Sequence, residues 1–454
     1  MPTHDIVVVG GGTAGAFAAA TAASDGVSVV VLERKPAADA GRIACGDAIK
    51  GAAAFPDVID LSYLKQESFT NGEISRGIFR TPGASEDVEI AFDETGVVLD
   101  RKRYGEVLLE EAERLGAEIR YETVVNDVRQ DDEGRVTGVK AVRNGAVETY
   151  EAAVVIDGAG ALSILQDAAD LSETTFDTNV SYTQYCSAYR ELLELSDPVA
   201  WDDAIVFAPT EQLGYLWYFP RSPTRINAGV GFQMSEEAMN LVEVLSGHVA
   251  SDPELQNATV VDKLGAALPT RRPYDSAVAP GFLAAGDAAG HVNPTTGGGI
   301  SGAAKAGHWA GREAVRAISA GEVSEASLWG YNREVMTGFG KRFAAADLYN
   351  IWGTSHDVDE LTDIVSSVPG QQLVDALSGG TLSLGLATAL RTLLNTVGHW
   401  GTLLELYRIR NRADALIEQY EVYPSDPANF PAWQRRRDEI LQDVYEICGA
   451  EPKY

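Results

Sequence analysis

A run of β-branched residues that ends abruptly in glycines, close to the start of the chain, most constrains the fold of this sequence. Residues 6–9 are Ile-Val-Val-Val, and they lead into Gly10, Gly12 and Gly15 before an alanine-rich segment that begins at Phe17. This G-x-G-x-x-G spacing predicts a buried parallel strand, a tight turn and a helix start. Glycines in such a turn let backbone N–H groups approach a pyrophosphate, and the helix N-terminus adds partial positive charge behind them.

The next apolar run, residues 27–32, predicts a second strand that ends at the acidic residue Glu33. Dinucleotide-binding units place an acid about 20 residues after the glycines, where it bonds a ribose hydroxyl. A glycine-rich turn without a ligand would need none of these neighbouring features. Strand, helix, second strand and acid in this order therefore predict a dinucleotide site.

Length and charge limit the remaining possibilities. The chain has 454 residues, 45% of them hydrophobic, which suffices for a large core and two interlocked domains. Acidic residues outnumber basic ones by 66 to 36, for a net charge of −30, and only nine of the basic residues are lysine. Such a surface suits molar salt, where repulsion is screened within about 3 Å. We therefore expect the cytoplasm of a halophile, rather than an acidic mesophilic protein, and no nucleic-acid partner.

Cysteine and histidine are sparse. Cys45, Cys186 and Cys448 are the only cysteines, too few for a disulfide framework, and their odd number indicates a reducing compartment. No two histidines have the H-x-x-x-H spacing of metal ligands, so we expect no metal site. No signal peptide precedes the first strand and no apolar run reaches about 18 residues, so we expect a cytoplasmic protein without a membrane span.

Further elements of the nucleotide-binding type are dispersed along the chain. Residues 153–156 and 282–285 predict two more buried strands, and residues 297–317 a long helix opened by glycines. A strand over 118–129 and a meander over 134–150 lie between them. A simple nicotinamide dehydrogenase would keep its Rossmann half contiguous, so the dispersal favours a flavoprotein with an inserted substrate sheet.

These elements divide the chain into three parts. We expect an α/β fold with a discontinuous Rossmann-type FAD-binding domain, an inserted, mostly antiparallel substrate-binding sheet and a helical C-terminal region. The expected ranges are 1–72, 98–172 and 265–345 for the first, 73–97 and 173–264 for the second, and 346–454 for the third. Helices are predicted over 104–115 and 236–248, and in the C-terminal part over 361–365, 372–377, 384–397, 400–420 and 431–447.

Several motifs resemble a known flavoprotein superfamily, the one that includes p-hydroxybenzoate hydroxylase. They are the stretch Gly10–Glu33, Leu99-Asp100-Arg101, and Gly286-Asp287-Ala288-Ala289-Gly290. Within that superfamily, further segments resemble the geranylgeranyl reductase family of archaea and plants. They are Arg42-x-x-Cys45-Gly46-Asp47, Tyr215-Leu-Trp217-Tyr-Phe219-Pro220 followed by Gly229-x-Gly231, and Asn293-Pro294 before Gly297-Gly298-Gly299-Ile300. The resemblance covers roughly residues 5–320 and implies FAD as the cofactor.

The resemblance also implies a place along FAD for individual residues, from the glycine turn at the pyrophosphate to the Cys45 loop at the isoalloxazine. The implied cofactor-binding residues are Gly10, Gly12, Ala14, Gly15, Glu33, Arg34, Arg42, Cys45, Gly46, Ala48, Arg101, Val125, Asp287, Gly298, Gly299 and Ile300. Asp287 could otherwise serve as a helix N-cap. A helix N-terminus at Gly299 and Ile300 has its own physical reason to face the flavin, since it stabilises the negative charge of the reduced ring by about 0.3–2 kcal/mol.

Tyr215, Trp217 and Phe219 alternate along a predicted strand, so all three project from one face. Three aromatics on a strand are more often part of a plain core. In the resembled family, however, the matching motif lines the channel for an isoprenoid chain, and a hydrocarbon ligand needs such an apolar lining. We therefore expect these three residues to bind substrate.

The role of Cys45 is the most open. A free cysteine is most often a small buried hydrophobe, whereas the resemblance places this thiol at the flavin, as a proton donor or as a thiolate that tunes the ring. Reduction of an isolated alkene needs a hydride at one carbon and a proton at the other, with the two donors flanking the double bond. Cys45 and Tyr215 are the candidate catalytic residues, and a water is the third alternative for the proton.

The resemblance implies an FAD-dependent reductase of isoprenoid double bonds, with the geranylgeranyl chains of archaeal membrane ether lipids as the expected substrate. Reduced ferredoxin or NAD(P)H would supply the electrons, and the C-terminal helices would make peripheral contact with the membrane that holds the substrate. Two other functions use the same scaffold: an FAD-dependent aromatic hydroxylase and a non-catalytic, electron-carrying flavoprotein. A compact pocket at the flavin would favour the hydroxylase, and a long apolar tunnel the reductase.

Overall fold

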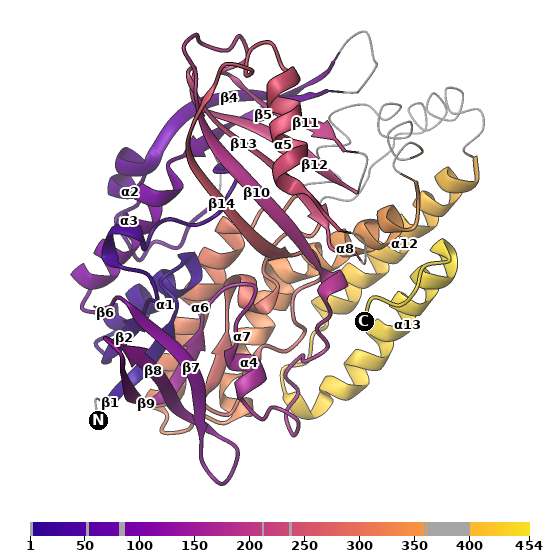
Figure 1. The fold of residues 1–454 in the computed structure, drawn as a ribbon. Helices are drawn as coiled ribbons and strands as arrows, with labels where there is room; N and C mark the ends of the chain where they lie inside the picture. The colour runs from indigo at the N-terminus through magenta and orange to yellow at the C-terminus, as the bar shows by residue number, and fades with distance from the viewer. Residues whose placement is uncertain are drawn as a thin grey trace.

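The computed structural model describes residues 3–50, 54–80, 87–210, 213–235, 238–357, 360 and 400–454. Two eight-stranded sheets lie one above the other in the view of Figure 1, with helices packed along one side. This arrangement confirms the predicted α/β fold with an inserted sheet and a helical C-terminal region. The helices predicted over 361–365, 372–377 and 384–397 lie outside the described residues.

The first sheet is built around the apolar run that opens the chain. Its strand order is β15-β16-β9-β1-β2-β6, and β7 and β8 form a meander attached to β9. Strands β16, β9, β1, β2 and β6 run parallel. Ile6, Val7 and Val8 are fully buried, as expected of a parallel sheet covered on both faces. The bounds are β1 Thr3–Val9, β2 Val29–Leu32, β6 Glu118–Arg120, β7 Thr123–Gln130, β8 Val136–Arg143, β9 Ala146–Asp157, β15 Val278–Ala279 and β16 Phe282–Ala284.

The alanine-rich helix α1 (Thr13–Ser24) is buried along almost its whole length. It packs against the strands of the first sheet and against α6 (Ile300–Ser319). The helices approach closely because α6 presents glycine: a Cβ on Gly307 would lie 2.1 Å from the Ala14 carbonyl oxygen. The small residues that recur along α6 therefore serve helix–helix packing.

The second sheet has the strand order β14-β10-β13-β12-β11-β4-β5-β3. All pairs are antiparallel except β11 with β4. Helix α5 (Leu241–Ser251) covers its outer face, where Leu245 is fully buried (Figure 1). Strands β4, β5 and β14 each continue past one of the expected domain boundaries, at 72, 97 and 264. The bounds are β3 Ala48–Lys50, β4 Phe69–Phe79, β5 Val88–Leu99, β10 Tyr185–Glu194, β11 Ala204–Pro209, β12 Gly214–Ser222, β13 Arg225–Gln233 and β14 Thr259–Pro269.

The single strand predicted over 118–129 is wrong, because it is divided into β6 and β7. Glu122 lies between them with a φ of +53°, and its N–H donates to the Lys35 carbonyl at 3.1 Å. β6 extends the parallel pairing on β2, whereas β7 pairs with β8. The predicted meander over 134–150 is confirmed: β8 and β9 pair across Asn144 and Gly145, which both have positive φ, as a two-residue hairpin requires.

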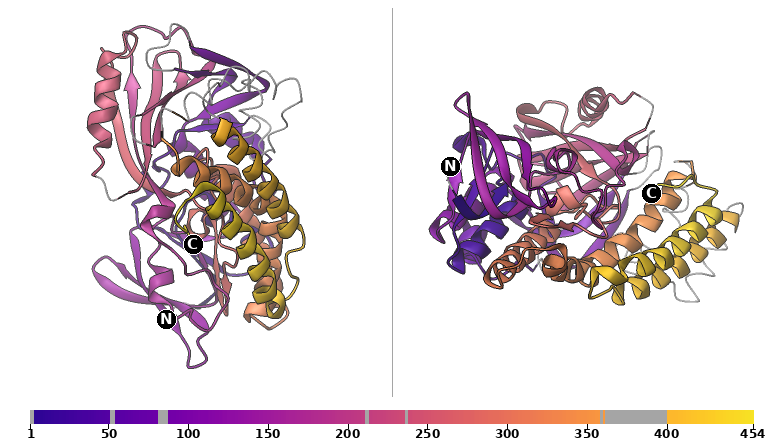
Figure 2. Two further views of the ribbon diagram at one scale, coloured as in Figure 1. Left: turned by 90° about the vertical axis from the view of Figure 1, so that its right-hand side faces the viewer. Right: turned by 90° about the horizontal axis from the view of Figure 1, so that it is seen from below.

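The C-terminal helices lie beside both sheets and run together along one side of the molecule (Figure 2). The helices predicted over 400–420 and 431–447 are confirmed as α12 and α13, and α8 packs against both. In the described ranges, no helix is at once long and apolar enough to cross a bilayer. The remaining bounds are α2 Leu61–Ser68, α3 Arg101–Arg114, α4 Leu165–Ala168, α7 Glu325–Val335, α8 Lys341–Thr354, α12 Trp400–Glu421 and α13 Phe430–Cys448.

Candidate functional site

The glycine turn after β1 forms a cradle that only small residues fit. Gly10 has a φ of +93°, and a Cβ on Gly15 would lie 2.0 Å from the Gly10 carbonyl oxygen. Helix α1 begins at Thr13 with Gly12 as its N-cap, and no side chain caps its first turn. Open backbone N–H groups at the positive end of a buried helix fit a pyrophosphate.

Glu33 ends β2 beside this turn and is fixed by the backbone. Its buried carboxylate accepts the Gly11 N–H at 2.8 Å. Arg34, which follows it, is exposed. Val125 is buried on β7, and the first N–H of that strand donates to the Glu33 carbonyl at 3.0 Å. Glu33, Arg34 and Val125, three of the predicted cofactor-binding residues, are therefore gathered around the end of β2.

Arg101 is a buried cation without a carboxylate partner among the described residues. It opens α3, and it is only 4% exposed. One guanidinium nitrogen donates to Thr13 Oγ1 at 3.0 Å, and the group lies over the Tyr104 ring, 5.0 Å from its centroid. Nη1 has no hydrogen-bond partner in the described part of the chain. A buried guanidinium with a free donor beside the glycine turn fits a phosphate or ribose oxygen.

Asp287 lies close to the glycine turn after β1, in the segment that follows β16. It lies in a short 3-10 helix, and a Cβ on the preceding Gly286 would lie 2.8 Å from that of Ala14. Burial raises the pKa of Asp287, while the charge of Arg101 acts in the opposite direction. The two predicted cofactor ligands therefore share one electrostatic environment, although they lie 186 positions apart in the sequence.

The start of α6 completes this side of the site. The helix begins at Ile300 with Gly299 as N-cap and, like α1, it has no side-chain cap. A Cβ on Gly299 would lie 3.6 Å from Asp287 Oδ1, and the Gly298 carbonyl accepts the Asn293 N–H at 3.0 Å. The first N–H groups of α6 are thus available to a ligand that gains negative charge.

The Cys45 loop crosses from the first sheet to the second. Cys45 is half-buried, and its sulfur accepts the Asp47 N–H at 3.3 Å. A Cβ on Gly46 would lie 2.9 Å from the Phe219 ring and 3.4 Å from Trp217 Nε1. Burial, and then the charge of Asp47, raise the pKa of the Cys45 thiol. This environment keeps the sulfur protonated at neutral pH and disfavours a thiolate.

Two further predicted residues attach this loop to the second sheet. Arg42 donates from Nε to Asp262 Oδ1 at 3.1 Å and from Nη2 to the Lys263 carbonyl at 3.3 Å. Ala48 opens β3 and pairs with Val98 of β5. The Arg42 guanidinium is therefore paired with a carboxylate of β14.

Tyr215, Trp217 and Phe219 project from one face of β12, as predicted, and Trp217 and Phe219 are 7% and 8% exposed. They form a continuous row of rings, with centroid distances of 6.1 Å from Tyr215 to Trp217 and 6.3 Å from Trp217 to Phe219. The Tyr215 hydroxyl donates to the Thr296 carbonyl at 2.9 Å, and burial raises its pKa. The row thus extends from the Cys45 loop to the glycines before α6.

Three buried residues join the Cys45 loop to this row: Asp47, which belongs to the motif that begins at Arg42, and Arg221 and Asn227, which were not predicted from the sequence. Arg221 and Asn227 each donate a hydrogen bond to the Asp47 carboxylate. Arg221 continues the alternation of the aromatic row along β12, and that periodicity could have identified it. Asn227 has no comparable signal, because its contacts come from segments far away in the sequence.

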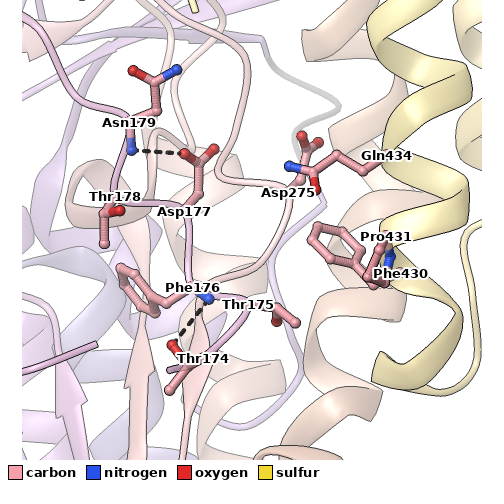
Figure 3. A pocket seen from close by; sticks show the side chains of 10 residues that line it. All are labelled: Thr174, Thr175, Phe176, Asp177, Thr178, Asn179, Asp275, Phe430, Pro431 and Gln434. Atoms are coloured by element: carbon pink, nitrogen blue, oxygen red, sulfur yellow. Dashed lines mark hydrogen bonds between the residues drawn. The ribbon is translucent and has the colours of Figure 1, made fainter. Parts of the chain in front are cut away.

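A separate cavity of about 330 Å³ lies between the segment 174–179 and the first turn of α13 (Figure 3). Asp275, Phe430, Pro431 and Gln434 complete its lining, and none of the predicted site residues belongs to it. In the portion of the chain that the structure describes, no three His, Cys, Asp or Glu side chains gather as metal ligands.

Comparison with known proteins agrees with this geometry. Residues 5–189 match the family described as FAD dependent oxidoreductase. The chain is 31% identical to digeranylgeranylglycerophospholipid reductase 1 of Methanopyrus kandleri, over 83% of this chain and 97% of that protein. It is 25% identical to the digeranylgeranylglycerophospholipid reductase of Sulfolobus acidocaldarius, over 97% of this chain and 98% of that one.

The fold likewise matches that of a geranylgeranyl bacteriochlorophyll reductase-like protein from Thermoplasma acidophilum. The TM-score is 0.72 at 20% identity, over 90% of this chain and all of that one. FAD is therefore the cofactor, as the motifs indicate, and Arg101, a buried arginine whose Nη1 has no hydrogen-bond partner among the described residues, fits its pyrophosphate beside the open glycine turn. The chain belongs to the digeranylgeranylglycerophospholipid reductase family of FAD-dependent oxidoreductases.

Proposed function

We propose that this enzyme reduces carbon–carbon double bonds in isoprenoid chains, with the geranylgeranyl chains of archaeal ether lipids as substrate. The observation that carries the proposal is the 31% identity to the Methanopyrus kandleri enzyme over 97% of that protein's length. The row of aromatic rings beside the Cys45 loop supports it, because a hydrocarbon chain needs an apolar surface next to the reacting group.

FAD supplies the hydride for one alkene carbon. Cys45 would hold the proton that the other carbon takes up, since partial burial and the charge of Asp47 raise the pKa of the thiol and keep it protonated. The Tyr215 hydroxyl is the alternative donor, but it already donates to the Thr296 carbonyl. Tyr215, Trp217 and Phe219 would bind the prenyl chain.

The cofactor contacts are part of the same proposal. Gly10, Gly12, Ala14, Gly15 and Arg101 would hold the pyrophosphate side; Glu33, Arg34 and Val125 the adenosine; Asp287 the ribityl chain; and Arg42, Cys45, Gly46, Ala48, Gly298, Gly299 and Ile300 the isoalloxazine end. The uncapped starts of α1 and α6 and the free Nη1 of Arg101 support this assignment. Reduced ferredoxin or NAD(P)H would deliver the electrons.

The decisive experiment follows the lipid and the flavin separately. Purified protein with FAD is reduced anaerobically with dithionite and mixed with a digeranylgeranyl ether lipid, and mass spectrometry then counts the hydrogen pairs added. We expect saturated product, and we expect Cys45→Ser to lower its turnover by about 10²–10⁴-fold at unchanged FAD content, with Cys448→Ser as the matched control. In a parallel aerobic assay, oxygen consumed with hydroxylated product would instead identify the hydroxylase, and a reducible flavin that yields no product in either assay would identify the electron carrier.

Peripheral contact with the membrane is the second part of the proposal. Helix α12 exposes Leu404 and Tyr407, one turn apart, with 51% and 59% of their surface accessible. Flotation with neutral liposomes in high salt should carry the protein upward, and Leu404→Ser with Tyr407→Ser should abolish this. Equal flotation of the double variant would contradict the role of α12.

The acidic surface supports a cytoplasm with molar salt. At a net charge of −30, repulsion among the acidic side chains destabilises the folded state at low ionic strength. At 1 M salt this repulsion is screened within about 3 Å. The thermal unfolding midpoint should therefore rise by several degrees between 0.1 and 2 M KCl. A midpoint that falls with salt would argue against a halophilic origin.

A further inference from the structure

The turn that holds Cys45, just before β3, is fixed by one buried side chain from another strand of the second sheet. Asn227 on β13 is 0% exposed, and its Nδ2 donates to the Cys45 carbonyl at 2.8 Å. The same Nδ2 donates to Asp47 Oδ2 at 2.6 Å, and Oδ1 accepts the Trp217 indole N–H at 3.1 Å. Because Nδ2 has two acceptors and Oδ1 has one donor, only one orientation of the Asn227 amide satisfies all three hydrogen bonds.

The turn needs such support because its backbone is unfavourable. Asp47 has a φ of +72°, which a residue with a side chain adopts only at a cost. Its carbonyl accepts the Leu99 N–H at 3.0 Å, and its carboxylate accepts Arg221 Nε at 2.8 Å. Arg221 also pairs with Asp100 at 3.4 Å, the residue that caps α3 ahead of Arg101.

We propose that Asn227 is a positioning residue for alkene reduction, which fixes the Cys45 thiol and the Trp217 indole relative to each other. The inference rests on the proposed function of Cys45 as the proton donor. Asn227 contacts neither reacting group: it bonds the backbone carbonyl of Cys45 and the indole N–H of Trp217. A proton donor displaced by about 1 Å from the double bond loses on the order of a hundredfold in rate.

The test replaces Asn227 by leucine, which keeps the volume and removes all three hydrogen bonds. Asn332→Leu is the matched control, because Asn332 is also buried and bonds Ala277 and Ser276 far from the Cys45 loop. We expect Asn227→Leu to lower kcat about a hundredfold at unchanged FAD content and to speed alkylation of Cys45 by iodoacetamide at least about tenfold relative to Cys186. Asn332→Leu should change neither.

Asn227→Asp provides a second variant should the leucine protein not fold. The new carboxylate still accepts the Trp217 indole N–H, but it lies against the carboxylate of Asp47. Protonation of the new carboxylate at low pH restores one hydrogen-bond donor toward Asp47. Its kcat should therefore recover as the pH falls toward 5, whereas a merely structural defect would not. Unchanged kcat and Cys45 alkylation in both variants, or losses that only follow FAD content, would overturn the inference. If the wild-type protein reduces no alkene, the proposed function fails, and Cys45 alkylation alone decides whether Asn227 positions the loop.

Discussion

Two buried polar clusters in this molecule look alike in composition but differ in what they join. The reactive-loop cluster consists of Asp47, Arg221 and Asn227, and the C-terminal cluster of Asp177, Arg271, Arg272, Asp275 and Arg437. The first holds a three-residue turn against a strand. The second ties α13 and the segment around 177 to the loop that follows β14, beside the cavity of Figure 3.

The two clusters also differ in how fully their charges are compensated. Asp275 is bonded by Arg272, Arg437 and the Tyr420 hydroxyl. In the reactive-loop cluster, Asp47 has a single arginine partner among the described residues, Arg221, and both Arg221 and Asn227 bond its Oδ2. A carboxylate shared by two arginines serves to join segments, whereas a single ion pair beside the site serves to place a loop.

The largest effect is expected from breaking the C-terminal cluster. Asp275→Asn would leave Arg272 and Arg437 buried without their shared countercharge, which should cost about 3–5 kcal/mol in the free energy of unfolding. Guanidinium denaturation followed by far-UV circular dichroism measures this loss, and the FAD absorbance spectrum of the folded variant should stay unchanged. Wild-type stability in this variant would contradict a joining role.

An intermediate effect is expected at Gly229 on β13, which pairs with Trp217 of the aromatic row. A Cβ on Gly229 would lie 2.1 Å from Cζ2 of Trp217, so Gly229→Ala must displace the indole. We expect a loss of about 1–3 kcal/mol in stability from overpacking and a larger KM for the prenyl substrate. Gly265→Ala on β14 is the control, since its Cβ would come no closer than 3.5 Å to any atom. An equal KM for the prenyl substrate in the two variants would show that Trp217 does not bind the substrate.

The two clusters should respond to acid with opposite signs. Burial raises the pKa of Asp47, and Arg221 offsets this only in part. Burial alone would raise the pKa of Asp177 as well, but Arg271 and Arg272 hold it below its usual value. Stability from Asp177 is therefore present above about pH 4 and lost as the pH falls through its folded-state pKa. Stability from Asp47 is present below about pH 4 and lost as the pH rises through its folded-state pKa.

Denaturation series for Asp177→Asn and Asp47→Asn measure this difference. The gap in unfolding free energy between wild type and Asp177→Asn should shrink below about pH 4, and that between wild type and Asp47→Asn should grow as the pH falls from 7 toward 4. Parallel changes in the two gaps would show that the clusters do not differ in this respect.

The smallest effect is expected from an exposed ion pair between α12 and α13. Asp443 of α13 lies 3.4 Å from Arg412, and both side chains are about half exposed. Asp443→Asn should cost less than about 1 kcal/mol, and less still at high salt. A loss as large as that of Asp275→Asn would mean that burial is not what distinguishes the C-terminal cluster.

Local spacing explains which parts of the site could be predicted. Gly10, Gly15 and Glu33 belong to one strand–turn–helix–strand unit, so their contacts follow from residues close together in the chain. The division of 118–129 into two strands could not be predicted, because it depends on the Lys35 carbonyl that accepts the Glu122 N–H. The hydrogen bond of Arg42 to Asp262 likewise joins residues 220 positions apart.

By itself, the sequence determined the glycine cradle and the aromatic row, since each arises from a spacing or a periodicity between residues close together in the chain, and its resemblance to a flavoprotein superfamily indicated the cofactor. Only the tertiary structure decided what holds the Cys45 turn and what joins α13 to the rest of the molecule. Asn227 and Cys45 are separated by 182 positions, and no pattern of propensity or polarity relates two residues that meet solely because distant segments come together in the second sheet.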